Sequence, residues 1–217
     1  MTSDPETMIA EVARTVTDER VLDAMRRVPR HRFVPVELRE WAYEDRPLPI
    51  GGGQTISQPT IVGMMTEALA LTGVEHVLEV GTGSGYQAAV LAELAHDVVT
   101  VEVIDALREG AARALADLDI HNVTVLPAEG GLGCAERAPY DAILVAAGAT
   151  EVPDALVAQL RVGGRLVIPV GDRDVQRLLV VTRTATGTTE ADLGLCAFVP
   201  LVDVPGTAGD APDARTS

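Results

Sequence analysis

Between residues 75 and 170, short apolar runs of strand length alternate with amphipathic runs of helix length. We expect strands at 76–80, 98–102, 123–126, 142–146 and 165–170, and helices between them at 85–94, 106–118 and 153–160. Strands that alternate with helices in this way are typical of a parallel sheet with helices on both faces. The pattern therefore predicts an α/β fold with a Rossmann-like, doubly wound and mainly parallel sheet, built by residues 75–171.

The segment before this core predicts a helical entry followed by loops. Residues 5–28 carry apolar side chains at helical spacing, and Thr17-Asp18 provides a break and an N-cap between two helices. Four prolines between residues 29 and 49 then favour loops with short helical pieces, up to the glycines at 51–53. We therefore expect two N-terminal helices and a long irregular connection to the core.

The segment after the core predicts two more strands. The apolar runs 177–184 and 193–199 have no helix between them, only the turn-rich stretch 185–189. They favour a C-terminal antiparallel hairpin within residues 176–201. Residues 203–217 have little to bury and are expected to form a disordered tail. Because 217 residues suit one domain, we place a single domain at residues 1–202.

Charge and composition exclude several classes of partner. A net charge of −15 repels phosphate backbones, so we expect neither nucleic acid nor an anionic membrane surface as a partner. No apolar run reaches the roughly 18 residues that span a bilayer, and the acidic stretch Met1–Glu6 does not resemble a secretory signal. Two cysteines, Cys134 and Cys196, form no disulfide framework in a chain of this size. We expect a cytoplasmic protein and take a monomer as the starting assumption.

A glycine-rich loop follows the first predicted strand of the core. Gly81, Gly83 and Gly85 stand at every second position, and a helix is predicted directly after them. Such a strand–loop–helix unit lets a ligand approach the backbone closely. Dinucleotide folds place glycine at the first, third and sixth positions, whereas the sixth position here is Tyr86. The loop therefore favours a nucleotide without a pyrophosphate.

Two carboxylates at strand ends indicate which nucleotide. Glu79 lies near the end of the first strand, where its carboxylate can face the positively charged amino-acid part of S-adenosylmethionine. Glu102 ends the second strand, where a carboxylate can accept hydrogen bonds from both ribose hydroxyls. We therefore predict S-adenosylmethionine as the cofactor, and a methyltransferase.

Six stretches match one family of methyltransferases. They are Val28-Pro-Arg-His-Arg-Phe-Val-Pro35, Ala42-Tyr-Glu-Asp-Arg-Pro-Leu-Pro-Ile50, Gly53-Gln-Thr-Ile-Ser-Gln-Pro59, Glu79-Val-Gly-Thr-Gly-Ser-Gly-Tyr-Gln87, Gly163-Gly-Arg-Leu-Val-Ile-Pro-Val-Gly171 and Phe198-Val-Pro-Leu201. On these stretches, within about residues 5–202, the chain resembles protein-L-isoaspartate O-methyltransferases. The resemblance implies transfer of a methyl group to the free carboxylate of L-isoaspartyl residues in proteins or peptides, which starts repair through a succinimide.

The resemblance also assigns roles to residues. It implies a substrate loop at 42–59, in which Ser57 is the catalytic residue and Thr55, Ile56, Ser57 and Gln58 bind the substrate. The predicted cofactor-binding residues are Gln54, Thr55, Ser57, Glu79, Gly81, Thr82, Gly83, Glu102, Val103, Glu129 and Gly130. The family usually carries Gly-Asp-Gly where this chain has Ala128-Glu-Gly130, so the acceptor for the adenine amino group stands on a longer side chain.

The residues at the end of the substrate loop could bind an acceptor that carries a negative charge. Ser57 and Gln58 precede Pro59, which marks the start of a helix whose first N–H groups and dipole can hold a carboxylate. Ser57 adds a hydroxyl donor, or serves simply as an N-cap. An acceptor carboxylate is already ionised at pH 7 and needs no general base. The four histidines show no metal-ligand or triad spacing, so we predict no metal site.

Other functions stay open. An enzyme with the same chemistry could methylate normal aspartate in a ribosomally made peptide, and the changes at Ala128-Glu129 and Cys134 would suit such a divergence. A methyltransferase acting on a small molecule and a non-catalytic cofactor-binding protein are further alternatives. A nucleic-acid amino-methyltransferase is disfavoured, because the run after the fourth strand reads Val145-Ala-Ala-Gly-Ala149 and lacks the Asn/Asp-Pro-Pro-Tyr motif.

Overall fold

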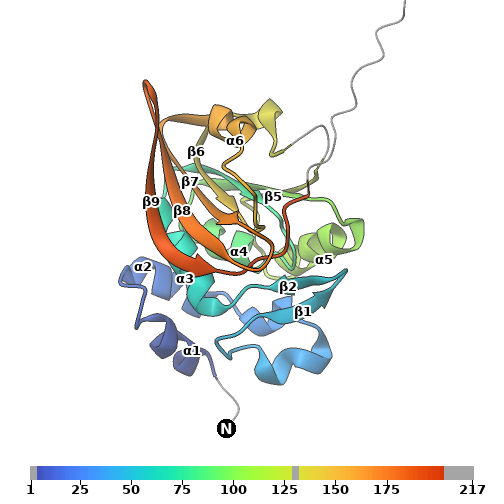
Figure 1. The fold of residues 1–217 in the computed structure, drawn as a ribbon. Helices are drawn as coiled ribbons and strands as arrows, with labels where there is room; N and C mark the ends of the chain where they lie inside the picture. Colours follow the sequence, from blue (N-terminus) through green and yellow to red (C-terminus); the bar gives the residue numbers. More distant parts are fainter. Residues whose placement is uncertain (1–3, 129–131, 203–217) are drawn as a thin grey trace, which may run out of the picture.

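A computed structural model describes residues 4–128 and 132–202. Its centre is a seven-stranded sheet in the order β5-β4-β3-β6-β7-β8-β9 (Figure 1). The strands are β3 (His76–Val80), β4 (Asp97–Glu102), β5 (Val123–Pro127), β6 (Tyr140–Val145), β7 (Leu160–Gly171), β8 (Gln176–Thr184) and β9 (Gly187–Cys196). Neighbours from β5 to β7 pair in parallel, while β7–β8 and β8–β9 pair antiparallel. The predicted doubly wound sheet with a C-terminal antiparallel hairpin is confirmed.

Helices cover both faces of this sheet (Figure 1). The helices that pack on its strands are α3 (Pro59–Leu69), α4 (Tyr86–Ala92), α5 (Asp105–Ala116) and α6 (Asp154–Gln159). The N-terminal helices α1 (Pro5–Val12) and α2 (Glu19–Arg27) pack against α3. Successive side chains of a strand point to opposite faces. Accordingly, Val77 of β3 belongs to one apolar cluster with Met65 of α3 and Leu91 of α4, whereas the next residue, Leu78, belongs to another with Leu156 of α6.

Short elements connect the N-terminal helices to the core. These are the 3₁₀ helices η1 (Arg30–Phe33) and η2 (Val36–Trp41) and the antiparallel pair β1 (Leu48–Gly51) and β2 (Gln54–Ile56), while a further 3₁₀ helix, η3 (Ala135–Arg137), precedes β6. The β1–β2 pair was not predicted, although its signal is present. Gly51, Gly52 and Gly53 have φ values of +93°, +60° and +73°, which suit the turn between two short strands.

The last strand of the hairpin begins earlier than predicted. We expected it at 193–199, but β9 runs from Gly187 to Cys196, and Thr184 pairs with Gly187 across the turn. β9 is an edge strand whose side chains are almost all exposed, so its polar first half shows no alternation of apolar and polar residues. The pattern therefore registered only the apolar end of the strand.

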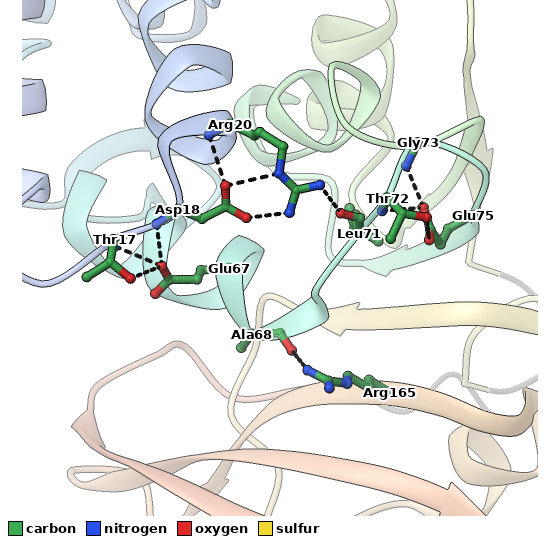
Figure 2. A network of polar contacts seen from close by, with 10 residues as sticks. All are labelled: Thr17, Asp18, Arg20, Glu67, Ala68, Leu71, Thr72, Gly73, Glu75 and Arg165. Atoms are coloured by element: carbon green, nitrogen blue, oxygen red, sulfur yellow. Dashed lines mark hydrogen bonds and ion pairs between the residues drawn. The ribbon is translucent and has the colours of Figure 1, made fainter.

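Polar contacts tie the N-terminal helices to the C-terminal end of α3 (Figure 2). Oε1 of Glu67 in α3 accepts hydrogen bonds from the backbone N–H of Thr17 at 2.8 Å and of Asp18 at 2.7 Å. Asp18 is the N-cap of α2, and Arg20 reaches from α2 to the carbonyl of Leu71 at 2.8 Å. These contacts hold one end of α3 in place, and the opposite end of the same helix faces the site described next.

Candidate active site

A pocket opens where the carboxyl ends of β3 and β4 meet the start of α4. Crevices at the carboxyl ends of parallel strands are the usual ligand sites of such sheets. The pocket encloses about 990 Å³, including open solvent at its mouth. Its lining combines the substrate loop (Gln54, Thr55, Ile56, Ser57), α3 (Val62, Met65), the glycine loop and α4 (Val80, Gly81, Thr82, Gly83, Ser84, Tyr86, Gln87), the end of β4 (Val101, Glu102, Val103) and later segments (Ala128, Leu132, Gly133, Ala146, Ala147, Val199, Pro200, Leu201, Val202).

The glycine loop and the end of β4 form one wall of this pocket, which we call the cofactor wall (residues 80–87 and 101–103). Gly81 donates its N–H to the carbonyl of Val101 at 2.9 Å, which binds the loop to the end of β4. Gly85 has a φ of +88°, and a Cβ there would come within 3.1 Å of the Cβ of Ala111 in α5. Glycine is therefore required for the loop to turn into α4 while packed against α5.

Glu102 lines the cofactor wall, as predicted, and its carboxylate is fixed by backbone groups. Oε2 accepts a hydrogen bond from Gly83 N–H at 2.8 Å, and Oε1 accepts one from Ile104 N–H at 3.0 Å. The side chain is buried except where it meets the pocket. Each carboxylate oxygen retains a second lone pair, so Glu102 can still accept hydrogen bonds from two neighbouring hydroxyls of a ligand.

Glu79 lies behind the wall rather than in it. Its carboxyl is fully buried, and Oε2 accepts a hydrogen bond of 2.5 Å from the Thr100 hydroxyl, which lies 2.6 Å from the hydroxyl of Thr82 in the pocket lining. Burial, reinforced by the nearby charge of Glu102, raises the pKa of Glu79 to about 8. The sequence argument had taken this group as an anion facing the cofactor. Without a cation nearby it is instead mainly protonated at pH 7.

The cofactor wall fits the predicted cofactor. Oε1 of Glu79 is buried with no hydrogen-bond partner among the described residues, which is costly and rare. A cationic amino group bound at the glycine loop would favour the ionised form of Glu79 and compensate that cost. Glu102 offers acceptors for a ribose, and Val103, 43% exposed, offers an apolar surface beside it.

A second wall of the pocket, which we call the acceptor wall, consists of Gln54, Thr55, Ile56 and Ser57. Gln58, predicted to bind the substrate, does not line the pocket. Gln58 is the N-cap of α3, so Ser57 stands one residue before the cap and is not the N-cap itself. The side chain of Ser57 is therefore not used to cap α3.

Asp45 occupies one of the first N–H groups of α3, which the sequence analysis had offered to the substrate. Its Oδ1 accepts a hydrogen bond from Thr60 N–H at 2.8 Å. Its Oδ2 accepts one from the Thr60 hydroxyl and one from Gln58 Nε2, both at 2.8 Å. The chain thus supplies its own carboxylate to the start of this helix, which stabilises the acceptor wall.

Arg30 is the residue of the site that sequence reasoning missed. Its side chain is fully buried behind the acceptor wall, where Nε donates to the carbonyl of Ala42 and Nη2 to the carbonyl of Ser57, both at 2.8 Å. The segment around it contains three basic residues, Arg30, His31 and Arg32, and nothing in their order shows which of them is buried. Only the tertiary fold distinguishes them.

The predicted adenine contacts at Glu129 and Gly130 lie outside the described residues. Their neighbours Ala128, Leu132 and Gly133 line the pocket. Gln159 of α6 holds this segment from behind, because it accepts a hydrogen bond from Cys134 N–H at 2.9 Å and donates one to the carbonyl of Leu132 at 2.8 Å. The backbone at Cys134 is therefore anchored by a side chain of α6.

Two further observations limit the chemistry of the described part of the chain. Within residues 4–128 and 132–202, no group of three or more His, Cys, Asp or Glu side chains is arranged to hold a metal ion. In the same ranges, no helix is long and apolar enough to cross a membrane.

The sheet and its pocket place the chain in a class. A glycine loop after β3 and a buried carboxylate at the end of β4 line one pocket with a polar loop segment. This combination is that of a methyltransferase with a Rossmann-like sheet that binds S-adenosylmethionine.

Comparison with known proteins identifies the family. A profile of the protein-L-isoaspartate(D-aspartate) O-methyltransferase family matches residues 5–206, and the chain belongs to this family. The protein-L-isoaspartate O-methyltransferase 1 of Rhodopseudomonas palustris (strain HaA2) is 53% identical over 214 residues, which cover 97% of this chain and 87% of that protein. The protein-L-isoaspartate O-methyltransferase 2 of Marinobacter nauticus is 54% identical over 197 residues, which cover 90% of each chain.

Solved structures agree with this assignment. A Plasmodium falciparum protein-L-isoaspartate O-methyltransferase in complex with S-adenosyl-L-homocysteine is 25% identical, with a TM-score of 0.80, over 92% of this chain and 99% of that one. A second protein-L-isoaspartate O-methyltransferase structure is 28% identical, also with a TM-score of 0.80. In that case the match covers 92% of this chain and 66% of the other.

Proposed function

We propose that this protein transfers a methyl group from S-adenosylmethionine to the free carboxylate of L-isoaspartyl residues in proteins or peptides, which starts repair through a succinimide. The observation that carries the proposal is that the cofactor wall and the acceptor wall line the same pocket. Membership of the protein-L-isoaspartate(D-aspartate) O-methyltransferase family supports the choice of acceptor.

Gly81, Thr82, Gly83, Glu102 and Val103 would hold the cofactor from one side, and Gln54, Thr55 and Ser57 from the other, since all of them line the pocket. Glu79 would act from behind through Thr100 and Thr82. The resemblance adds Glu129 and Gly130 as the adenine contacts. When bound, S-adenosylmethionine supplies a methyl group on a positively charged sulfur that is open to in-line attack.

The chain's own residues contribute orientation rather than proton transfer. The acceptor carboxylate is ionised near pH 7, so its oxygen forms the new bond to the methyl carbon as the carbon–sulfur bond breaks, and the bonding pair stays on sulfur. Ser57 orients the carboxylate through its hydroxyl, and Thr55 and Ile56 contact the peptide around it. Apolar side chains of Met65, Val199 and Leu201 in the lining keep water from the reacting atoms.

The test compares two peptides that differ only in the linkage at one aspartyl residue. The protein is incubated with methyl-labelled S-adenosylmethionine and either the isoaspartyl or the aspartyl peptide. Base-labile label on the isoaspartyl peptide alone is the expected result. Label on the aspartyl peptide would favour a tailoring enzyme instead. No label on either, with S-adenosylhomocysteine bound in calorimetry, would refute the proposed acceptor.

The Ser57→Ala variant tests the assignment of the catalytic residue. We expect kcat/KM for the isoaspartyl peptide to fall about 10- to 100-fold, because one oriented hydrogen bond to a charged group is lost. The affinity for S-adenosylhomocysteine should change less than about threefold. The matched control is Thr188→Ala, which removes an exposed hydroxyl on β9 and should leave both quantities unchanged. Equal activity of the Ser57 variant and the control would exclude Ser57 as the catalytic residue.

The remaining features of the proposal concern setting and assembly. We place the enzyme in the cytoplasm as a monomer that acts on protein or peptide substrates and binds neither nucleic acid nor membranes. The net charge of −15 and the free thiols of Cys134 and Cys196 support this setting. Sedimentation of the purified protein at several concentrations tests the monomer, and a concentration-dependent mass would contradict it.

A further inference from the structure

A single buried guanidinium touches both walls of the pocket from behind. Arg30 in η1 donates Nη2–H to the carbonyl of Ser57 on the acceptor wall. Its guanidinium carbon also lies 4.9 Å from the ring centroid of Tyr86, the first residue of α4 and part of the cofactor wall. Ser57 and Tyr86 both line the pocket, whereas Arg30 does not. Arg30 therefore links the two walls without entering the space between them.

Among the described residues, Arg30 forms no ion pair that would compensate its charge. Nε and Nη2 both donate to uncharged backbone carbonyls, Ala42 and Ser57, and Nη1 is buried without a hydrogen-bond partner among the described residues. The carboxylate that favours its charged form is Asp45, which itself accepts three hydrogen bonds from Gln58 and Thr60. Burial lowers the pKa of Arg30 to about 10, so the side chain stays cationic at neutral pH.

Burying the charge of Arg30 costs free energy, because the guanidinium is removed from water. Its two hydrogen bonds to carbonyls offset part of that cost. What an apolar side chain cannot reproduce is the planar fork that binds two carbonyls and stacks on an aromatic face together. The geometry of Arg30 thus suits a task of positioning better than one of stabilising the fold.

The chemistry expected in the pocket requires the two walls to be positioned relative to each other. Among the described residues of the lining, Glu102 is the one charged side chain, so no Lys or Arg reaches the acceptor directly. In-line transfer needs the acceptor oxygen and the methyl carbon at a near-attack separation of roughly 3–3.5 Å. That separation depends on the spacing between the wall that holds the peptide carboxylate and the wall that holds the cofactor.

We propose that Arg30 is a positioning residue that sets the spacing between the acceptor wall and the cofactor wall, through the carbonyl of Ser57 and the ring of Tyr86. The predicted change in kcat rests on the proposed function, whereas the anchoring of the acceptor wall by Arg30 rests on the geometry alone. Without the guanidinium each wall keeps its own binding groups, but the distance between them is no longer held. The loss should therefore appear in kcat more than in the binding of either ligand.

The test uses Arg30→Met, Arg30→Lys and the matched control Arg32→Met. Arg32 lies two residues further along η1, where its side chain is 40% exposed and pairs with Asp117 at 3.6 Å. We expect Arg30→Met to lower kcat about 10- to 100-fold, with KM for the isoaspartyl peptide and Kd for S-adenosylhomocysteine changed less than about threefold. Arg30→Lys should recover part of kcat, because it keeps the charge and one donor, and Arg32→Met should behave as wild type.

Amide hydrogen exchange gives a second readout that does not depend on activity. Exchange in a peptide covering residues 54–58 should be faster in Arg30→Met than in wild type and unchanged in Arg32→Met. If wild type methylates neither peptide, the proposed function fails, and the exchange data still decide whether Arg30 anchors the acceptor wall. The inference is overturned if Arg30→Met keeps wild-type kcat, if its exchange at 54–58 is unaltered, or if kcat falls only in proportion to lost ligand affinity.

Discussion

The cofactor wall and the acceptor wall line the same pocket but are held by different kinds of contact. In the cofactor wall, backbone N–H groups of neighbouring elements make the contacts that hold the wall: Gly81 donates to the carbonyl of Val101, and Gly83 and Ile104 donate to the carboxylate of Glu102. In the acceptor wall, side chains from elsewhere in the chain hold the backbone. Arg30 reaches Ser57 across 27 residues, and Asp45 reaches Thr60 across 15.

The support of the cofactor wall is of a general kind, whereas the support of the acceptor wall is particular to this protein. A glycine loop and a strand-end acid form wherever a strand, a loop and a helix follow one another in a parallel sheet. A wall made of extended chain has no such regular support, so it depends on individual buried side chains. We therefore expect changes in the cofactor wall to alter cofactor affinity, and changes behind the acceptor wall to alter use of the peptide.

The largest effect should come from Glu102→Gln. The amide is neutral and places an N–H₂ group where one carboxylate oxygen accepts from the backbone, so one N–H loses its acceptor and the hydrogen bonds to a ribose weaken. We expect Kd for S-adenosylhomocysteine to rise about 100-fold, equivalent to about 2.7 kcal/mol. Isothermal titration calorimetry measures this directly.

A matched control for this variant is Glu109→Gln in α5. Glu109 is 60% exposed and pairs only loosely, at 3.7 Å, with Arg113 one turn later. Its replacement should leave the cofactor affinity unchanged. If the two variants bind S-adenosylhomocysteine equally well, Glu102 is not a cofactor ligand, and the description of the cofactor wall fails.

A smaller effect, on peptide binding rather than on cofactor binding, is expected from Asp45→Asn. The amide can satisfy only part of the three donors that Thr60 and Gln58 direct at Asp45, so the start of α3 loosens. We expect KM for the isoaspartyl peptide to rise about 10-fold while cofactor affinity stays within threefold. Steady-state kinetics with both substrates varied separates the two.

The control here is Asp23→Asn, which removes an exposed carboxylate paired with Arg26 on α2. It should leave both constants unchanged, because exposed ion pairs contribute little. An Asp45 variant that loses cofactor affinity as strongly as peptide affinity would show that the two walls are not separately supported.

The same contrast explains how much of the molecule the sequence predicts. The strands between residues 76 and 170 could be predicted from local patterns, because the alternation of elements lies within short stretches, although β7 begins at Leu160 rather than at Arg165. The same holds for the pocket-lining residues Gly81, Gly83 and Glu102. Even there, the burial of Glu79 behind Thr100 depends on the next strand and was not foreseen. Arg30 and Asp45 leave no local pattern, because what defines their roles is a partner many residues away.

The smallest predicted effect concerns pH and again divides the two walls. Glu79 has an ordinary pKa of 4.5 when the chain is unfolded and about 8 when it is folded. Between these values the unfolded chain has lost the proton and the folded protein has kept it, so the free energy of unfolding falls as pH rises, by at most about 1.4 kcal/mol per pH unit. The Glu79→Gln variant cannot titrate there and should give a flatter profile of stability between pH 6 and 7.

Cofactor binding should depend on the protonation of Glu79 as well. A cationic amino group at the glycine loop favours ionised Glu79, so binding of S-adenosylhomocysteine to wild type should release protons and tighten as pH rises towards 8. Calorimetry in buffers of different ionisation enthalpy counts those protons. On the acceptor side, Arg30 stays charged throughout this range, so KM for the peptide should not share the trend. If wild type and Glu79→Gln release equal numbers of protons, Glu79 is not the group that titrates on cofactor binding. The predicted difference in pH dependence between the two walls is then wrong.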